Sequence, residues 1–332
     1  MKWALVILAA TAYAQEPTFK TKAHEVVVPV SVMTKLNKPV ENLRAEDFEV
    51  LSDERPQQVR MVLRDSTPLP IYAVIVLQIG GAVEPALAKV KKTASVVSSY
   101  ITNDMDIGVP SMTAVVTVGD EVKTAQRFTA DPDILGDAFA KLAATGSSSR
   151  LIDGVSLACD LLAEKKDPAR RVIVLISESR DLGSKGNFSE AVIKAQRTDV
   201  AIYTISYSAF TTAFTERASD SPEPPSEPGL YDPDNHGGMN LLAIPMLLAR
   251  LAKTNVAQAF AQSTGGSHEK FTTLHGLETK LTVIGAEIHN RYVLAFTPPE
   301  SPTPGYHEIS VRIRRPGDFR VHARAGYWEN PK

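Results

Sequence analysis

The run YAVIVL, at Tyr72–Leu77, is apolar without a break. Two comparable runs follow at Val172–Ile176 and Val200–Ile205, and both are rich in β-branched residues. A strand with one face in water alternates apolar and polar residues, whereas a strand buried on both faces of a parallel sheet is apolar throughout. The three runs therefore predict strands in the interior of one parallel sheet.

Segments with helical periodicity separate these runs. Apolar residues recur at three- and four-residue spacing in Ala86–Tyr100, Leu151–Ala163 and Phe188–Ala195. The serines Ser147–Ser149 are expected to cap the second of these helices, and Ser189 is a candidate cap for the third. A longer amphipathic helix is predicted over Leu241–Gln262, with its end at Gly265–Gly266. Strands that alternate with helices in this way predict a doubly wound α/β sheet.

The two ends of the chain follow a different pattern. Apolar and polar residues alternate in Val28–Val32, and the same alternation recurs in Ile309–Ile313 and Phe319–Ala323. Phe48 and Val50 lead into a turn at Asp53–Pro56, after which Val59, Met61 and Leu63 return, as in a hairpin. This period of two is typical of antiparallel strands with one buried face.

Neither end holds enough strands for a stable sheet domain of its own. We therefore predict that segment 15–68 pairs with segment 291–332 in one β-sandwich, and that the α/β domain, residues 69–290, is inserted between them. Within that domain, residues 209–240 include the Pro-rich stretch Ser221–Pro228, which lacks large apolar side chains. We expect a flexible, solvated insertion there, with a proline-rich ligand site as the alternative.

Composition and the first residues indicate the compartment. The formal net charge of the 332 residues is -2, which argues against a nucleic-acid partner. Lys2, the apolar stretch Trp3–Thr11 and the small residues of Ala12-Tyr13-Ala14 predict a signal peptide over residues 1–14. That stretch is too short to span a bilayer, and no second stretch is long enough. We expect an exported protein, periplasmic or extracellular, without a membrane span.

Several of these sequences resemble a known family. Val74–Val83 looks like the first strand and loop of a von Willebrand factor type A (vWA) domain, a Rossmann-like fold. Arg171–Asp181 is similar to its fourth strand and the loop after it, and Ser149–Asp153 to its second metal-binding loop. The flanks resemble the bacterial exported VWFA-related family in segments Leu43–Phe48, Ser263–Gly266, Arg291–Phe296 and Arg324–Tyr327.

The resemblance implies a metal-ion-dependent adhesion site, which holds a divalent cation with an Asp, two Ser, a Thr and a second Asp. The matching positions here are Gln78, Gly80, Ala82, Ser149 and Glu178. Gly80 and Ala82 supply no side-chain oxygen, and Gln78 supplies no charge. We therefore expect a degenerate site without a cofactor, and weak residual Mg²⁺ binding stays open as the alternative.

Other patterns point to no further chemistry. The sequence shows no nucleophile–base arrangement and no Gly-rich phosphate loop. The stretch Asp232–Gly237 superficially resembles a calcium loop, but Ala243 stands where an EF-hand needs Glu. The single cysteine, Cys159, forms no intramolecular disulfide and is expected to be buried in a helix. His268, His275 and His289 lack metal-ligand spacing and are expected to be surface or packing residues.

Three functions are compatible with these patterns. The resemblance implies a non-catalytic module that mediates protein–protein interaction or adhesion in the cell envelope, with a partner that the sequence does not identify. The alternative is a structural scaffold or assembly factor of an envelope complex. The third is a hydrolase with an unrecognised site, which we expect a substrate screen to exclude. Nothing in the sequence indicates an oligomeric state.

Overall fold

The computed structural model describes residues 25–63, 69–93, 101, 111–208, 243–298 and 304–329. The predicted signal peptide, the Pro-rich insertion and the stretch Asp232–Gly237 lie outside these described residues. No helix of the described part combines the length and the apolar character that a membrane crossing requires.

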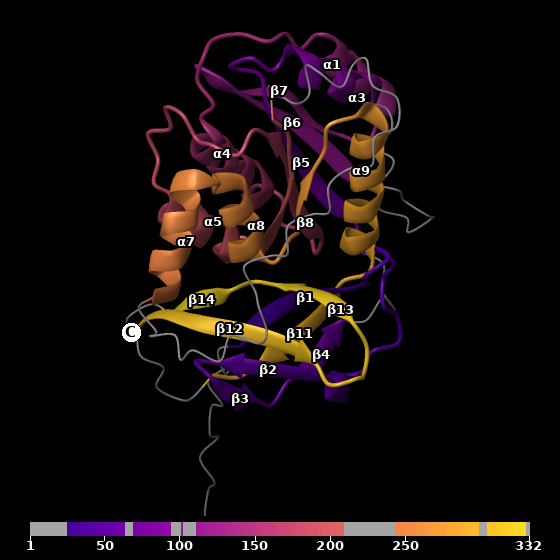
Figure 1. The fold of residues 1–332 in the computed structure, drawn as a ribbon, viewed down its shortest axis with the longest axis vertical. Coiled ribbons are helices and arrows are strands. Elements are labelled where there is room, and N and C mark those ends of the chain that lie inside the picture. Colours follow the sequence, from indigo (N-terminus) through magenta and orange to yellow (C-terminus); the bar gives the residue numbers. More distant parts are fainter. Residues whose placement is uncertain are drawn as a thin grey trace, which may run out of the picture.

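A six-stranded sheet forms the centre of the α/β part, in the order β10-β9-β8-β5-β6-β7 (Figure 1). β7 is antiparallel to β6, and all other neighbours are parallel. The three apolar runs of the sequence are adjacent strands of this sheet, which confirms the prediction of a parallel α/β class. The strands are β5 (Ile71–Gln78), β6 (Met112–Val118), β7 (Val122–Thr129), β8 (Arg170–Ser177), β9 (Val200–Ser206) and β10 (His268–Lys270).

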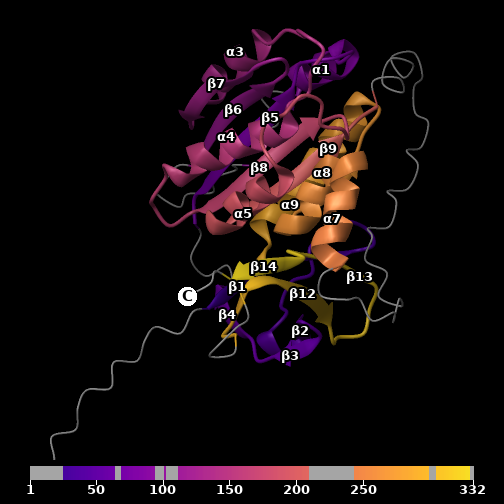
Figure 2. The same cartoon turned by 90° about the vertical axis from the view of Figure 1, so that its left-hand side faces the viewer.

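Helices cover both faces of this sheet, as Figures 1 and 2 show. Residues Ile71, Ala73, Ile75 and Leu77 of β5 share one buried cluster with helices α1 (Glu84–Lys92), α3 (Pro132–Ala140) and α9 (Leu274–His289). The alternate residues Tyr72, Val74 and Val76 pack in a second cluster with α4 (Leu151–Ala163), α5 (Phe188–Arg197) and α8 (Val256–Thr264). Burial on both sides explains why β5 is apolar at every position, and the strand order is that of a doubly wound sheet.

Three helix predictions were wrong in detail. The predicted helix Leu241–Gln262 is interrupted at Asn255, which accepts a hydrogen bond from the Gln258 amide and so begins α8 after α7 (Ala243–Thr254). Helix α5 is capped by Asn187, not by Ser189. Helix α4 has Arg150 at its N-cap position and no side-chain cap of its own, so the three serines before it do not fill that role. The end at Gly265 is as predicted, with a left-handed φ of 80°.

Strands from the two ends of the chain pair with one another in two four-stranded sheets. The first has the order β13-β1-β11-β4 and the second the order β14-β12-β2-β3. Their buried side chains form one cluster that includes Val28, Val50, Leu294 and Val311. The strands are β1 (Val26–Thr34), β2 (Phe48–Ser52), β3 (Arg55–Gln57), β4 (Arg60–Leu63), β11 (Tyr292–Phe296), β12 (Gly305–Ile313), β13 (Phe319–Ala323) and β14 (Gly326–Glu329), and a 3-10 turn, η1 (Ala45–Asp47), precedes β2.

The predicted hairpin around Asp53 is shorter than the sequence suggested. Asp53 and Glu54 both have positive φ, 49° and 63°, which is the geometry of a tight type I′ hairpin turn. This turn pairs β2 with β3, whereas β4, which holds Met61, crosses to the other sheet and pairs with β11. The α/β part and the two β sheets lie one above the other in Figure 1.

Candidate functional site

Three loops meet where β5 and β8 end, the edge at which open α/β sheets bind ligands. The first follows β5, the second precedes α4, and the third follows β8. Backbone hydrogen bonds join the first two: the Thr145 amide donates to the Ile79 carbonyl over 2.8 Å, and the Gly81 amide to the Gly146 carbonyl over 3.1 Å. We call the surface of these loops that carries Ala82, Arg180 and Leu182 the rim surface.

Gln78 ties the first loop to the third. Its side-chain carbonyl accepts a hydrogen bond from the Glu178 amide over 2.9 Å, and its side-chain amide donates to the Gly80 carbonyl over 2.9 Å. The amide nitrogen also lies 3.5 Å from Oε2 of Glu178. Gln78 is 2% exposed, so both ends of its amide are used inside the protein.

Gly80 lies where the loops approach most closely. An ideal Cβ at this position would be 2.0 Å from the carbonyl oxygen of Ser148 and 2.9 Å from the Cα of Gly119. Both neighbours are backbone atoms, which give way less easily than the end of a flexible side chain. The loops are therefore packed too closely here for any residue larger than glycine.

The second and third loops are joined by a short antiparallel bridge. The Ser149 amide donates to the Leu182 carbonyl over 2.9 Å, and the Leu182 amide donates back to the Ser149 carbonyl over 3.0 Å. The Ser149 hydroxyl donates to the Arg180 carbonyl over 3.0 Å. Ser149 is 2% exposed, so its side chain holds the third loop from the interior of the protein.

Asp181 holds the first turn of α4, a role that no pattern in the sequence indicates. Its Oδ1 accepts a hydrogen bond from the Ile152 amide over 2.9 Å, and also from the Ser184 hydroxyl over 2.6 Å. The Asp153 amide donates to the Ser184 hydroxyl over 3.2 Å. The third loop thus supplies the capping oxygens for the first turn of α4, in place of the serines that precede the helix.

Asp153 fixes the far end of the same loop. Its carboxylate accepts hydrogen bonds from the amides of Lys185 and Gly186, and Arg150 pairs with it over 2.6 Å. Burial raises the pKa of Asp153, but these two amides and the Arg150 guanidinium outweigh it, so the pKa lies below its ordinary value. Asp153 therefore connects the start of α4 to the loop that follows β8.

Asp120, after β6, fastens the second loop. Its Oδ1 accepts hydrogen bonds from the amides of Ser147 and Ser148 over 3.1 and 3.0 Å. Hydrogen bonds from Ser148, first from its side chain, lower the pKa of Asp120. Strand β6 is not one of the three apolar runs of the sequence, because Thr113 and Thr117 interrupt it. The sequence therefore does not indicate that the loop after β6 belongs to this edge of the sheet.

The residues that match the adhesion site do not fit a divalent cation. Gln78 spends both of its polar atoms on the loops, and Ser149 directs its hydroxyl hydrogen at Arg180. Gly80 has backbone atoms where a serine side chain would stand, and Ala82 has no side-chain oxygen. A cation needs several oxygens already placed around it, together with negative charge. Within the described residues, no three His, Cys, Asp or Glu side chains cluster as metal ligands would.

The other residues singled out in the sequence are not part of these three loops. Cys159 is fully buried in α4, as predicted, and burial raises the pKa of its thiol to about 12, so it is neutral and unreactive at physiological pH. His268 lies in β10, and His275 and His289 lie at the two ends of α9. The three histidines therefore do not converge on the loops of the rim surface.

The chain matches no protein-family model and no curated protein. It is similar to solved structures, among them BatB from Bacteroides thetaiotaomicron, at 13% identity and a TM-score of 0.44 over 66% of this chain and 98% of that one. The vWF domain of the type V pili tip protein Mfa5 from Porphyromonas gingivalis is 10% identical, with a TM-score of 0.40, over 65% and 94% of the two chains. The VWA domain of SpRpn10 is 20% identical, with a TM-score of 0.34, over 46% and 84%. At these identities and TM-scores the similarity gives no information on the chemistry of any site.

Proposed function

We propose that this chain is an exported, non-catalytic binding protein whose vWA-like α/β domain holds a protein partner at the rim surface without a metal ion. The proposal is supported by the fact that buried side chains hold these loops in place while other side chains of the same loops are exposed to solvent. Gln78, Ser149 and Asp181 hold the loops from inside, while Leu182 is 55% exposed and Arg180 is exposed beside it. Loops fixed on a rigid scaffold bind with little loss of conformational entropy.

The character of the rim surface suggests how it binds. Where a cation is present, it attracts an acidic side chain of the ligand; here an apolar side chain and a guanidinium stand at the same edge. Arginine combines an apolar stem with a charged planar group and is enriched at the centres of protein interfaces. We propose a partner that offers an apolar pocket for Leu182 next to a carboxylate for Arg180.

The compartment and the domain arrangement belong to the same proposal. We propose that residues 1–14 are removed on export, so that the intact mass of the exported protein corresponds to a chain that begins at Gln15. A mature form that still contains Trp3 would contradict export by this route.

We further propose that the two four-stranded sheets act as one β-sandwich, with the α/β domain inserted into it.

The test compares substitutions on the rim surface with a substitution at an exposed leucine elsewhere on the protein. Leu182→Asp and Arg180→Glu change the rim surface, and Leu36→Asp changes a leucine that is 81% exposed in the turn after β1. Each variant is purified from its native source, and co-purifying proteins are quantified by mass spectrometry. We expect one partner to be lost from both rim variants and kept by Leu36→Asp. Retention of all partners by the rim variants would favour the alternative, a scaffold that is bound through another surface.

A further inference from the structure

The contact between the α/β part and the two β sheets, here called the joint, lacks a continuous apolar core. Among the described residues, two buried apolar clusters belong to the α/β part and a third belongs to the β sheets. Apolar burial is the main source of affinity between packed units, and a joint without it depends on polar contacts. Two hydrogen bonds of the joint are those from the Gln196 side chain to the Gly326 carbonyl and from the Ala325 amide to the Gln262 carbonyl.

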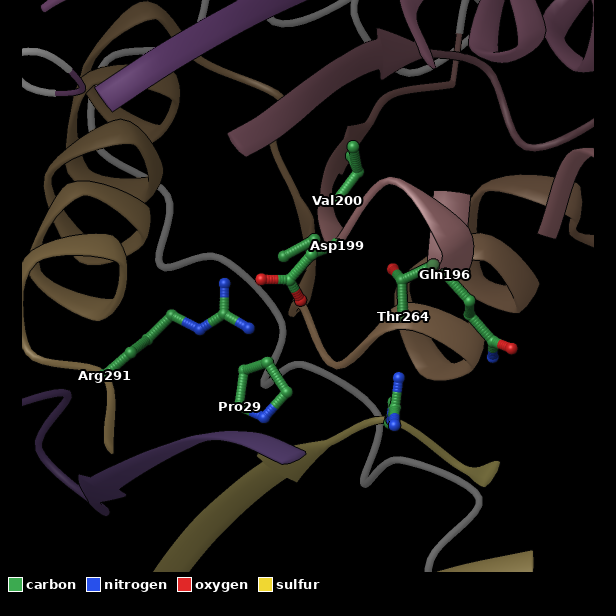
Figure 3. A pocket seen from close by; sticks show the side chains of 8 residues that line it. Pro29, Gln196, Asp199, Val200, Thr264 and Arg291 are labelled. Carbon is green, nitrogen blue, oxygen red and sulfur yellow. The ribbon is translucent and has the colours of Figure 1, made fainter. Parts of the chain in front are cut away.

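One end of the joint is a small polar crevice (Figure 3). Pro29, Arg291 and Arg324 line it from the β sheets and the segments next to them, and Gln196, Asp199 and Thr264 line it from the α/β part. The cavity measures about 10 Å³, which is room for about one water molecule. Oε1 of Gln196 and the Nε atoms of both arginines are buried without a partner in the described structure, and a water can satisfy such groups. The crevice can therefore hold about one water molecule and is too small for a larger ligand.

The middle of the joint holds a buried ion pair. Glu287, on α9, is fully buried, and its Oε2 lies 3.3 Å from Nδ1 of His322 on β13. The other carboxylate oxygen, Oε1, has no hydrogen-bond partner among the described residues. A buried carboxylate is costly unless a positive charge or a donor compensates it, and protonated His322 is placed to supply that charge. Its side chain is 26% exposed, which allows protons to exchange with water.

Several other charged and polar groups surround this pair. On the neighbouring β10, Glu269 is already paired with Lys280 of α9 over 2.9 Å. Arg320 lies on β13 with His322, and Arg291 and Arg170 lie near Tyr203 of β9. Burial raises the pKa of Tyr203 to about 12, so that this phenol stays neutral. Histidine is the type of side chain among these whose ordinary pKa lies near neutral pH.

We infer that the joint is closed by the ion pair between Glu287 and protonated His322, and that it loosens when His322 loses its proton. Burial alone lowers the pKa of His322, but the charge and the hydrogen bond of Glu287 outweigh it, so the pKa is raised. The stabilisation is therefore complete below the pKa of a free histidine, about 6.5, and is lost as the pH rises through the raised pKa. This inference is independent of what binds at the rim surface.

Hydrogen exchange followed by mass spectrometry tests the joint in the full-length exported protein. Amide exchange in α9 and β13 is measured at pH 5.5 and 8.0 and corrected for the intrinsic pH dependence. We expect several-fold faster corrected exchange at pH 8.0 in the wild type, and equally fast exchange at both values in His322→Gln. The matched control is His275→Gln, since His275 is 90% exposed and faces Glu278 at 3.9 Å; it should behave as the wild type.

A direct titration gives a second, independent result. The pKa of His322, measured by NMR, should lie above that of a free histidine and should fall in Glu287→Gln. If that variant does not fold, the wild-type titration and His322→Gln remain. A wild-type His322 pKa at or below the free value overturns the inference, and so does a His322→Gln variant that keeps the pH dependence of the wild type.

Discussion

The side-chain oxygen of Gln78 accepts a hydrogen bond of 2.9 Å from the backbone amide of Glu178, 100 residues further along the chain. Gln78 ends β5, and Glu178 directly follows β8, the strand paired with β5. A neutral amide can accept from one loop and donate to another, which an aspartate at the same position cannot do. A direct protein contact thus joins the two loops that a cation joins in the family that the sequence resembles.

Replacing Gln78 by leucine should destabilise the protein. The substitution leaves the Glu178 amide without its partner, and an unsatisfied buried group costs about 1–3 kcal/mol. The free energy of unfolding, measured by urea denaturation, should fall by that amount. Gln57→Leu is the control, because its side chain binds the Arg55 carbonyl at an exposed edge strand; a change within about 0.5 kcal/mol is expected there. Equal effects of the two substitutions would show that the contact of Gln78 is unimportant.

Restoring the oxygen ligands of the adhesion site should fail at Gly80. Because a Cβ there meets the Ser148 carbonyl at 2.0 Å, Gly80→Ser should lower the melting temperature, whereas Ala82→Ser, at an exposed position, should not. The variant Gln78→Asp with Gly80→Ser, Ala82→Ser and Glu178→Asp should consequently gain no stability from millimolar Mg²⁺. The wild type should also melt at the same temperature with Mg²⁺ and with a chelator. A Mg²⁺-dependent shift in the wild type that Glu178→Ala abolishes would reveal a working metal site.

Removing the carboxylate of Asp181 should weaken both α4 and the third loop. In Asp181→Ala the Ile152 amide loses its cap, and loss of a capping side chain costs about 0.5–2 kcal/mol. Asp137→Ala, at an exposed position in α3, is the matched control. Amide exchange in the first turn of α4 should increase in the first variant alone. Unchanged exchange there would mean that the loop does not cap the helix in solution.

The carboxylate of Asp153 should make the loop after β8 sensitive to acid. Its pKa is lowered in the folded protein, so its contribution is present above the pKa of a free aspartate, about 3.9, and is lost as the pH falls through the lower folded value. Stability measured from pH 6 down to pH 2 should decline less steeply in Asp153→Asn than in the wild type. Parallel curves for the two proteins would show that the carboxylate makes no such contribution.

Deleting residues 310–332 should unfold the N-terminal strands as well. The deletion removes β13, β14 and the part of β12 from Ser310 to Ile313, which holds most of its pairing with β2, and β1 pairs directly with β13. Limited proteolysis should then cut within residues 25–63, which are protected in the complete protein. Continued protection of that segment would show that the strands of the N-terminal end are stable without their C-terminal partners.

The parallel sheet was predictable because a strand that is buried on both faces has an almost unbroken run of apolar residues. β5, β8 and β9 are largely apolar, and short apolar runs rich in β-branched residues are typical of strands buried on both faces of a parallel sheet. β6 and β7 were not predicted, since threonines interrupt one and the other alternates at the sheet edge. The break at Asn255 was missed because apolar periodicity continues across it, and only the capping contact to Gln258 reveals two helices.

The candidate site was predictable in its position but not in its construction. Gln78 ends β5, and Gly80 and Glu178 follow the ends of β5 and β8, in the loops to which the resemblance assigns them. The roles of Asp120, Asp153 and Asp181 depend on contacts between loops that are far apart in sequence. Such contacts follow no local pattern, because any Asp in a loop can accept backbone hydrogen bonds and only the tertiary fold selects the donor.

The position of β1 between β11 and β13 has a consequence for biosynthesis. During synthesis, β1 emerges long before either of its neighbours, and even the buried hydrogen bond from the Leu43 amide to the Tyr292 hydroxyl joins residues that are 249 positions apart. Strand pairing over such separations is slow, because a long loop must close before the contacts form. Until then Val26–Val32 offers an apolar edge with which other chains can pair, so the nascent chain is prone to aggregation for nearly the whole time of its translation.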